Sequence, residues 1–217
     1  MHSFTEENYL KVIYHLSQVS DSAVQTNAIA DRMNTRAASV TDMLKKLADK
    51  KLLDYIKYQG VTLTESGKMA AVRVVRKHRL WEVFLVEKLN FGWDEVHDIA
   101  EELEHINSEV LVERLDNFLG YPKRDPHGDP IPDKDGIFEP SLNIHLSEML
   151  MGHKGIIIGV SEYAPSFLRH LERLGLTIGV SLELIEITDY DGSAELRVDD
   201  KRVNVSREVA QHILIKL

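Results

Sequence analysis

The sequence contains no cysteine in its 217 residues. This absence excludes disulfide bonds, thiolate zinc sites and cysteine nucleophiles. No apolar run approaches the roughly 18 residues that a membrane-spanning helix requires. The polar, acidic start MHSFTEENYLK lacks the apolar core of a secretory signal. We therefore expect a cytoplasmic protein with no membrane partner.

Proline is scarce except in one segment. Five of the six prolines lie between residues 120 and 145, among glycines and charged residues. Such a composition is typical of a linker, so we expect a boundary there between two parts of the chain. His127 lies in this segment and is expected in a turn or at the surface.

Positive charge is in deficit over the whole chain, which carries a net charge of −9. Its distribution is uneven, because residues 1–80 hold 13 Lys and Arg against 8 Asp and Glu, a balance of +5, and residues 81–217 have a balance of −14. This asymmetry indicates a basic binding module joined to an acidic remainder that would suit metal capture or oligomer contacts. Ordinary charge variation is the alternative interpretation.

Apolar periodicity in the first 65 residues predicts a DNA-binding module. Helical stripes cover residues 5–19, 25–33 and 37–51, and two β-type runs flank Tyr58-Gln59-Gly60. Three helices and a hairpin in this order make a winged helix-turn-helix, with a solvated helical hairpin as the alternative. The segment ASVTDMLKKLADKKLL is the expected recognition helix.

The recognition segment and the hairpin predict two kinds of contact with DNA. Small and polar residues at the front of the helix are placed to reach base edges, and lysines behind them and in the hairpin are placed to meet phosphates. The candidate DNA-binding residues are Thr35, Arg36, Ala37, Ser39, Thr41, Lys45, Lys46 and Lys57.

Histidines and carboxylates gather on predicted helix faces in the middle of the chain. The six candidate metal ligands are His78, Glu82, His97, Glu101, Glu104 and His105. The last four occupy offsets 0, 4, 7 and 8 of one segment, within roughly a 100° arc of a helix, and the first two stand at i and i+4 on the preceding helix. Nitrogen and oxygen ligands without sulfur favour Mn²⁺, with Fe²⁺ as the alternative. Solvated surface side chains are the simpler interpretation.

The surrounding segments predict a dimer layer and a small β domain. Apolar stripes over residues 66–89 and 107–119 flank the ligand-bearing helix expected at 93–106. One small bundle would not bury them alone, so we expect a helical dimerisation layer. After residue 145, short β-type runs around one helix predict a β-barrel of roughly 70 residues.

Together these segments resemble the diphtheria-toxin-repressor family of metal-dependent transcriptional regulators over essentially the whole chain. EENYLKVIYHL is similar to the family's first helix, RKHRLWEVFL and VHDIAEELEHI to its two ligand helices, and PHGDPIP to a short motif before its linker. The resemblance implies a mainly α fold with α+β parts. Its expected domains are a winged helix-turn-helix at 1–72, a helical metal-binding and dimerisation domain at 73–140, and an SH3-like β-barrel related to the ferrous-transport accessory fold at 141–217.

The family has two metal sites per subunit, and the resemblance implies ligands for both. One site would use His78, Glu82 and His97, completed by Glu162 from the carboxy-terminal domain. The other site, which governs activation, would use Asn8, Glu101, Glu104 and His105.

Two positions of the activating site depart from the family's patterns. Asn8 stands where the manganese-sensing branch has Asp and the iron-sensing branch has Met, and it offers only a neutral carbonyl. Glu101 matches the manganese branch, whereas the iron branch has Cys there. Lys11 stands where the manganese branch can offer a second carboxylate, which argues against a closely bridged pair of ions.

The implied function is a metal-dependent transcriptional regulator, expected to be a repressor. It would bind double-stranded operator DNA as a homodimer when loaded with Mn²⁺ or Fe²⁺, control metal-uptake genes and take no small organic substrate. A di-metal carboxylate enzyme is the alternative, because Glu102 and His105, and Asp94 and His97, stand three residues apart as in helical-bundle enzymes. A metal-independent winged-helix adaptor is a further alternative.

Overall fold

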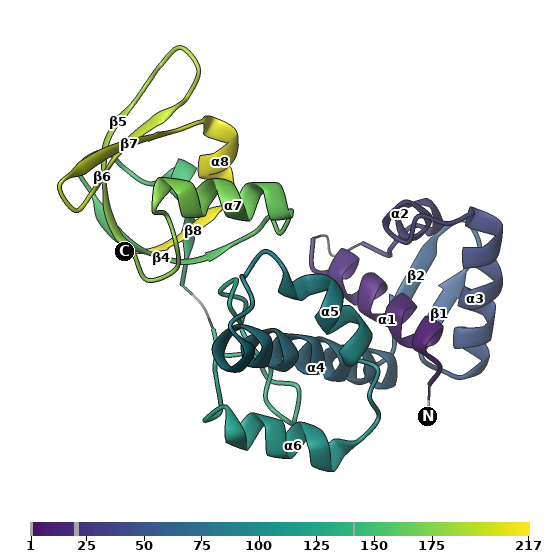
Figure 1. Ribbon diagram of the computed structural model, residues 1–217. Helices are drawn as coiled ribbons and strands as arrows, with labels where there is room; N and C mark the ends of the chain where they lie inside the picture. Colours follow the sequence, from purple (N-terminus) through teal and green to yellow (C-terminus); the bar gives the residue numbers. More distant parts are fainter. Residues whose placement is uncertain (1, 20–21, 141) are drawn as a thin grey trace. The chain divides into compact units, whose positions relative to one another are not determined.

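The computed structural model describes residues 2–19, 22–140 and 142–217 (Figure 1). The chain divides into two compact units, each described here by itself. Unit 1 comprises Met1–His78, Glu101–Glu109 and Pro132–Ile137, and unit 2 comprises Arg79–Ala100, Val110–Ile131 and Phe138–Leu217. None of the described helices is both long and apolar enough to cross a membrane.

Unit 1 begins with three helices and a hairpin. These elements are α1 (Phe4–Ser17), α2 (Thr26–Arg32), α3 (Ala37–Asp49), β1 (Leu53–Ile56) and β2 (Gly60–Leu63). Figure 1 shows the three helices gathered beside the antiparallel β1–β2 hairpin. The predicted winged helix-turn-helix is confirmed, and each helix ends one or two residues earlier than its apolar stripe indicated.

Local sequence explains where the helices of unit 1 begin and which face they bury. The Ser3 hydroxyl accepts a hydrogen bond from the backbone of Glu6, and the Glu6 carboxylate accepts one from the backbone of Ser3, a reciprocal cap that starts α1. In α3, Val40, Leu44 and Leu47 repeat at helical spacing and are all 0% exposed. The opposite face of α3 is therefore left for solvent or a partner.

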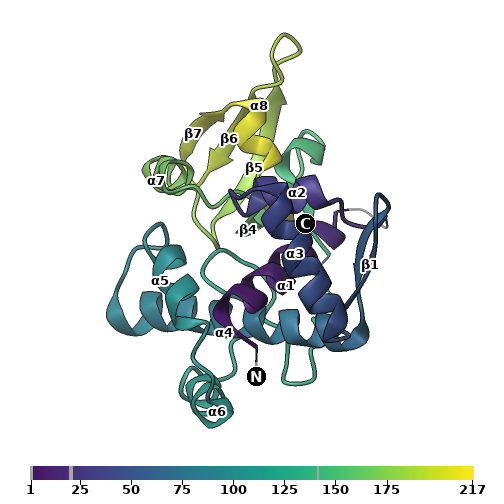
Figure 2. The ribbon, with the colours of Figure 1, turned by 90° about the vertical axis from the view of Figure 1, so that its right-hand side faces the viewer.

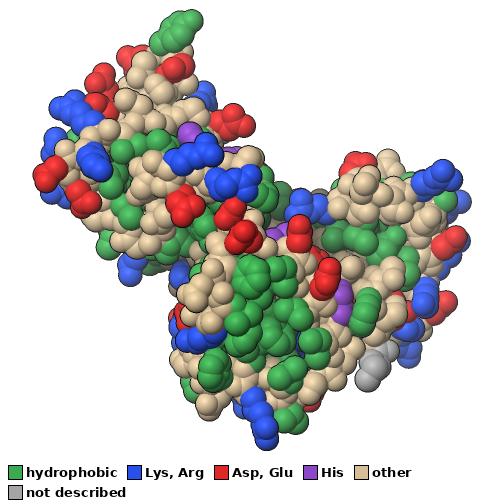
Figure 3. Space-filling model, viewed as in Figure 1, with side chains coloured by type: hydrophobic (Ala, Val, Ile, Leu, Met, Phe, Trp, Pro, Cys, Tyr) green, Lys and Arg blue, Asp and Glu red, His purple; other side chains and the backbone are tan. Residues whose placement is uncertain are grey.

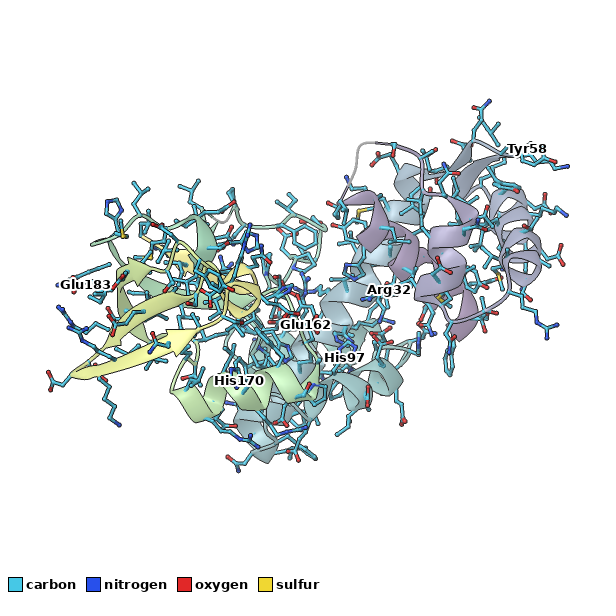
Figure 4. All side chains as sticks on the ribbon, turned by 90° about the horizontal axis from the view of Figure 1, so that it is seen from above. Arg32, Tyr58, His97, Glu162, His170 and Glu183 are labelled. Carbon is cyan, nitrogen blue, oxygen red and sulfur yellow. The ribbon has the colours of Figure 1, made fainter. Side chains whose placement is uncertain are left out.

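The hairpin ends in a tight turn with an exposed aromatic ring. Tyr58 has a φ of +67° and is 87% exposed, and Figure 4 shows its side chain at the outer end of this part of unit 1. Val24 forms an isolated bridge with Val61 of β2, which ties the segment before α2 to the hairpin.

Three further helices carry the middle of the chain. The long helix α4 (Glu65–Leu89) runs from unit 1 into unit 2, and α5 (Val96–Leu103) and α6 (Glu109–Phe118) follow. The expectation that one helix extends to residue 106 is wrong, because Glu104 and His105 lie in the turn after α5. In a helix, two successive side chains point about 100° apart. The turn instead lets Glu104 and His105 both be buried.

The carboxy-terminal part of unit 2 is an antiparallel sheet with the order β3-β8-β4-β5-β6-β7 (Figure 2). Its strands are β3 (Ile144–His145), β4 (Lys154–Val160), β5 (Ser181–Ile187), β6 (Ala194–Val198), β7 (Lys201–Val205) and β8 (Ile213–Lys216). The expected closed barrel is wrong, because β3 has only two residues and pairs only with β8 among the described residues, so the sheet remains open at β3 and β7. The short strands and their SH3-like setting are otherwise as expected.

Helices complete the core of this sheet. They are η1 (Leu146–Glu148), α7 (Pro165–Leu174) and α8 (Arg207–Gln211). Leu168 and Leu171 of α7 pack into one buried cluster with Ile157 and Leu184 of the sheet. Gly175 ends α7 in the left-handed conformation that favours glycine.

The proline-rich segment is packed rather than free over part of its length. Asp125 Oδ1 accepts hydrogen bonds from the backbone of His127 and Asp129 at 2.9 Å, which forms a tight turn. His127 is 2% exposed and Asp125 is 6% exposed. His127 thus lies in a turn, as expected, but it is buried within unit 2 instead of facing solvent.

Candidate metal centres

A buried cluster of charged side chains lies within unit 1. Its members come from α1, from α4, and from the end of α5 with the turn that follows: Glu7, Asn8, Lys11, His78, Glu101, Glu104 and His105. Glu104 is 0% exposed and stands at the centre of these contacts. The sequence-based ligands Glu101, Glu104 and His105 thus meet residues of the first helix.

Lys11 pairs with two of the carboxylates. Its Nζ donates to Glu101 Oε1 at 2.6 Å, and to Glu104 Oε1 and Oε2 at 2.6 and 2.8 Å. His78 Nδ1 lies 2.7 Å from Glu104 Oε2. An ammonium has three N–H donors, so these two carboxylates match its full capacity. A cation therefore already stands between Glu101 and Glu104.

His105 is oriented by a carboxylate that the sequence analysis did not identify. Its Nδ1 lies 2.7 Å from Glu7 Oε2, and the ring of Phe4 stacks on the imidazole with centroids 4.8 Å apart. A carboxylate accepts, so Nδ1 donates and Nε2, 3.8 Å from Glu104 Oε1, keeps its lone pair. This is the arrangement in which a second carboxylate prepares a histidine to bind a metal. Only the position of Glu7 next to Asn8 hinted at it.

Asn8 provides the test of whether these residues fit a metal. Its Oδ1 is buried and has no hydrogen-bond partner among the described residues. Such an acceptor costs roughly 1–3 kcal/mol when it stays unpaired, and native proteins hold few of them. An oxygen ligand with this need, one residue after the Glu7 that holds His105, fits a divalent cation.

A second buried cluster lies within unit 2. Ligand atoms of Glu82, Asp125 and His127 all lie within 4.8 Å of one another. Glu82 Oε1 is 3.6 Å from His127 Nδ1 and also 3.6 Å from Nδ1 of His97, whose side chain is 48% exposed. His127 Nε2 donates to the Trp93 carbonyl at 2.7 Å, which leaves Nδ1 facing Glu82.

The electrostatics of this second cluster favour a bound cation. Burial raises the pKa of Asp125 to about 7, with added repulsion from Asp129 and Glu82. Burial alone would lower the pKa of His127, but Glu82 and Asp125 outweigh it and the pKa is raised. Two carboxylates that repel each other in a dry site are a donor set that a divalent cation would stabilise.

A glycine places His127 against the sheet. Gly128 has a φ of +91°, and a Cβ there would lie 2.0 Å from the Ile158 carbonyl oxygen of β4. The close approach lets the backbone of Val160 donate to the His127 carbonyl at 2.9 Å. In the segment PHGDPIP, the glycine is thus required by packing against β4, and the histidine belongs to the cluster with Glu82 and Asp125. Asp125, one residue before the segment, was not recognised from the sequence.

The remaining sequence-based ligands are distributed between the units. His78 belongs to unit 1, where it faces Glu104. Glu82, His97 and Glu162 belong to unit 2, and Figure 4 labels His97 and Glu162. The Glu162 carboxylate accepts a hydrogen bond from the backbone of Ala164 at 2.8 Å. The grouping of His78 with Glu82, His97 and Glu162 stays a prediction.

The candidate DNA-binding residues lie on the exposed side of α3 and on the hairpin. Thr35, Arg36, Ala37 and Ser39 are exposed, as are Lys45, Lys46 and Lys57. The Thr41 hydroxyl donates to the Ala37 carbonyl at 2.9 Å, and Lys46 pairs with buried Glu6 at 3.0 Å. Lys57 lies over the Tyr58 ring, 4.8 Å from its centroid.

An apolar surface lies on unit 2. Val110, Leu111 and Phe118 of α6 are 60%, 38% and 64% exposed, although α6 buries Leu115 against Leu80. Figure 3 shows hydrophobic side chains gathered over α4 and α6. Exposed apolar area of this kind marks an interaction surface.

Family models match the chain over most of its length. Residues 1–61 match the family model of the iron-dependent repressor amino-terminal DNA-binding domain, and residues 64–133 match that of the iron-dependent repressor metal-binding and dimerisation domain. The chain belongs to the diphtheria-toxin-repressor family of metal-dependent transcriptional repressors. Residues 144–217 match the FeoA domain, which agrees with the expected carboxy-terminal fold.

Individual relatives agree with the family assignment. The diphtheria toxin repressor of Corynebacterium diphtheriae is 27% identical over 98% of this chain and 96% of its own length. The regulator MntR of Oceanobacillus iheyensis is 35% identical over 55% of this chain and 80% of its length. The iron-dependent repressor IdeR of Mycobacterium bovis is 35% identical over 59% of this chain, and there the chain spans about half of the relative, 55%.

Solved structures extend the likeness to the whole chain. A manganese-dependent transcriptional repressor in complex with manganese is 37% identical, covers 97% of this chain and 98% of its own, and superposes with a TM-score of 0.86. The structure of ScaR with bound Zn²⁺ is 35% identical over 97% of this chain and 98% of its own, with a TM-score of 0.78. The chain therefore shares its fold with these structures over nearly its whole length.

Proposed function

We propose that this protein is a metal-dependent transcriptional repressor of the cytoplasm. It binds double-stranded operator DNA as a homodimer when loaded with Mn²⁺, with Fe²⁺ as the alternative ion, and controls metal-uptake genes. One observation carries the proposal: Glu7 and Lys11 of α1, the first helix of the DNA-binding domain, contact His105 and Glu104 in one buried cluster. The charge state of that cluster is therefore coupled to the position of the DNA-binding helices.

The activating site would be held by four residues of unit 1: Asn8, Glu101, Glu104 and His105. A divalent cation bound there would supply two positive charges that neutralise the carboxylates of Glu101 and Glu104. The ion would also link α1 to the turn after α5. Glu7 orients His105 through its Nδ1, so the histidine is prepared without being a ligand at that nitrogen. Ligands without sulfur support Mn²⁺.

The second site would be centred on Glu82 in unit 2. Ligand atoms of Glu82, Asp125 and His127 lie within 4.8 Å of one another, which supports all three as ligands. The raised pKa of Asp125 supports the same assignment. His97 faces the same Glu82 oxygen and is a further candidate. Glu162 and His78 remain candidates from the family resemblance alone.

DNA would be read by α3 and the hairpin. Arg36 and Ser39 at the exposed front of α3 would approach base edges, and Lys45 and Lys57 would meet phosphates. Lys46 already pairs with Glu6, so its contribution to phosphate binding is expected to be smaller. Two such modules would face half-sites across a two-fold axis.

The homodimer would be formed by the apolar surface over α4 and α6. Val110, Leu111 and Phe118 are exposed on the same helix that buries Leu115 in the core. A homodimer interface commonly has such an apolar centre. Self-association across a two-fold axis would cover the same surface on both copies.

We infer that the protein is a regulator and not an enzyme. The enzyme alternative needs Glu102 with His105 and Asp94 with His97 at one di-metal site. Glu102 is exposed, and the Asp94 carboxylate pairs with Arg169 at 2.8 Å. Both observations support the regulator.

The deciding experiment is DNA binding by the metal-free protein, titrated with Mn²⁺, with Fe²⁺ under anaerobic conditions and with Zn²⁺, on a pool of promoter fragments from the source organism. Binding should appear only with metal, and Glu104→Gln should abolish it. Glu102→Gln is the matched control, because it removes an exposed carboxylate two residues away and should bind like the wild type. Equal binding with and without metal, or a Glu104→Gln variant that responds normally, would overturn the proposal.

A further inference from the structure

The ammonium of Lys11 occupies the oxygens that the proposed activating site needs. It contacts one oxygen of Glu101 and both oxygens of Glu104, all at 2.6 to 2.8 Å. The Lys11 side chain is 10% exposed, and that of Glu104 is 0% exposed. All three contacts are short and charge-assisted; those with Glu104 are buried and the one with Glu101 is partly buried, so they are stronger than surface ion pairs.

We propose that Lys11 is a resident cation that competes with the divalent ion for Glu101 and Glu104 and so weakens metal binding at this site. The inference rests on the proposed metal site and adds the residue that sets its threshold. Lysine ammonium and metal ion cannot both sit close to the same carboxylate oxygens without strong repulsion between their charges. Binding of the ion therefore requires Lys11 to leave.

The charge balance explains why the exchange is possible. Glu101, Glu104 and Lys11 together carry a charge of −1, so the metal-free cluster retains an affinity for positive charge. Replacement of the ammonium by a divalent ion gives two carboxylates and one ion whose charges sum to zero. The flexible four-carbon stem of lysine can carry its charge away by rotamer changes, whereas a guanidinium would be held by its planar fork.

The same contacts stabilise the metal-free fold. Lys11 stands on α1 and its two partners stand at the end of α5 and in the turn that follows, so the ammonium joins the elements that the ion would join. Without Lys11, the Glu104 carboxylate, which is 0% exposed, would face Glu101 without the positive charge that now pairs with both. A competing lysine therefore has two effects of opposite sign, on metal affinity and on metal-free stability.

The test measures both effects in Lys11→Met, which keeps an unbranched side chain, one atom shorter than that of lysine, and removes its charge. Mn²⁺ affinity is measured by titration calorimetry in a Glu82→Gln background, which disables the proposed site of unit 2 and leaves one binding event per subunit. Lys11→Met should bind Mn²⁺ at least tenfold more tightly than the wild type, and its melting temperature in EDTA should fall by several degrees. Lys11→Arg keeps the charge and should bind Mn²⁺ no more tightly than the wild type.

Two further variants keep the test decisive. Lys50→Met is the matched control, since Lys50 also pairs with a buried carboxylate of unit 1, Glu6, at 2.7 Å, and its loss should leave Mn²⁺ affinity unchanged. Lys11→Gln is neutral but still forms hydrogen bonds, and it should repeat the tightening if Lys11→Met does not fold. Unchanged or weaker Mn²⁺ affinity of a folded neutral variant, Lys11→Met or Lys11→Gln, would overturn the inference and leave the site intact. If neither the protein with Lys11 nor any Lys11 variant takes up Mn²⁺ in the Glu82→Gln background, the proposed site itself would be overturned.

Discussion

The imidazole of His105 lies 2.7 Å from the carboxylate of Glu7, measured between Nδ1 and Oε2, and both side chains are 7% exposed. Because a carboxylate accepts, the proton resides on Nδ1, and Nε2 faces the proposed ion site with a free lone pair. Glu7 belongs to the first helix of the DNA-binding domain, so the orientation of this histidine depends on where that helix lies.

Replacement of Glu7 by Gln should weaken Mn²⁺ binding at the unit 1 site by 10- to 100-fold, the range found for partners that orient a metal-bound histidine. The amide no longer fixes the tautomer, although no proposed ligand is lost. Calorimetric titration of Mn²⁺ checks this. Glu6→Gln is the control, because Glu6 is the neighbouring buried carboxylate but pairs with Lys46 and Lys50. Equal affinities for the wild type and Glu7→Gln would contradict the role of Glu7.

Replacement of Asp125 by Asn should reduce the stabilisation that Mn²⁺ gives to the protein. In EDTA the variant should melt at or above the temperature of the wild type, because the repulsion of Asp125 by Glu82 and Asp129 is removed. Addition of Mn²⁺ should stabilise the wild type by several degrees more than the variant, since the site has lost a charged ligand. Thermal melts in both conditions measure the difference. A variant that gains as much from Mn²⁺ as the wild type would remove Asp125 from the site.

Replacement of Gly128 by Ala should lower the free energy of unfolding by about 3 kcal/mol, through overpacking and an unfavourable backbone conformation. A Cβ would lie 2.0 Å from the Ile158 carbonyl oxygen at a φ of +91°. Gly175→Ala is the control, because Gly175 also has a positive φ, of +72°, but has open space around it. It should cost about 1 kcal/mol. Urea unfolding compares them, and equal losses would show that the contact with β4 is unimportant.

Replacement of Phe118 by Asp should convert the dimer into a folded monomer. Phe118 is 64% exposed on the apolar surface over α4 and α6, and a charge there would be buried by self-association. Sedimentation measures the mass and circular dichroism checks the fold. Tyr190→Asp changes an isolated exposed aromatic residue, 97% exposed, and should leave the dimer unchanged. A Phe118→Asp variant that still sediments as a dimer would place the interface elsewhere.

The stabilising effect of Glu6 should disappear in acid. Burial by itself raises the pKa of Glu6, but hydrogen bonds from Lys50, Ser3 and Lys46 lower it to about 2 from an ordinary value of 4.5. A lowered pKa stabilises the fold above the unfolded value and loses that effect as the pH falls from about 4.5 to about 2. The gain at neutral pH is on the order of 2 kcal/mol, reduced because both lysines are partly exposed.

Urea titrations in EDTA of the wild type and Glu6→Gln at pH values from 6 to 2.5 test this. The difference in unfolding free energy between them should be largest at pH 6 and should shrink steadily below pH 4.5. A difference that stays constant with pH would mean that the ion pairs of Glu6 do not stabilise the fold.

Much of the fold could be predicted from local patterns. The stripe of Val40, Leu44 and Leu47 predicts α3, and Gly175 predicts the end of α7, because burial periodicity and glycine conformations act over a few residues. The open edge of the sheet could not be predicted, because strand pairing at β3 depends on contacts far apart in the sequence. The end of α5 was also missed, since burial of Glu104 and His105 outweighs the continuation of a helical pattern.

The candidate sites divide in the same way. Spacing on one segment determined that Glu101, Glu104 and His105 would be near one another, because a few residues of regular backbone set that distance. The partners from remote segments were decided only by the tertiary structure. Glu7 reaches His105 across 98 positions of the sequence, and Lys11 reaches Glu104 across 93.

The sequence by itself thus determined the family, the order of the elements and the residue types that a cation would need. The tertiary structure alone decided which charges face each other: Lys11 between Glu101 and Glu104, and Asp125 beside Glu82. The physical reason is that pairing energies between buried charges depend on distances of a few ångströms, and packing of the whole chain sets those distances.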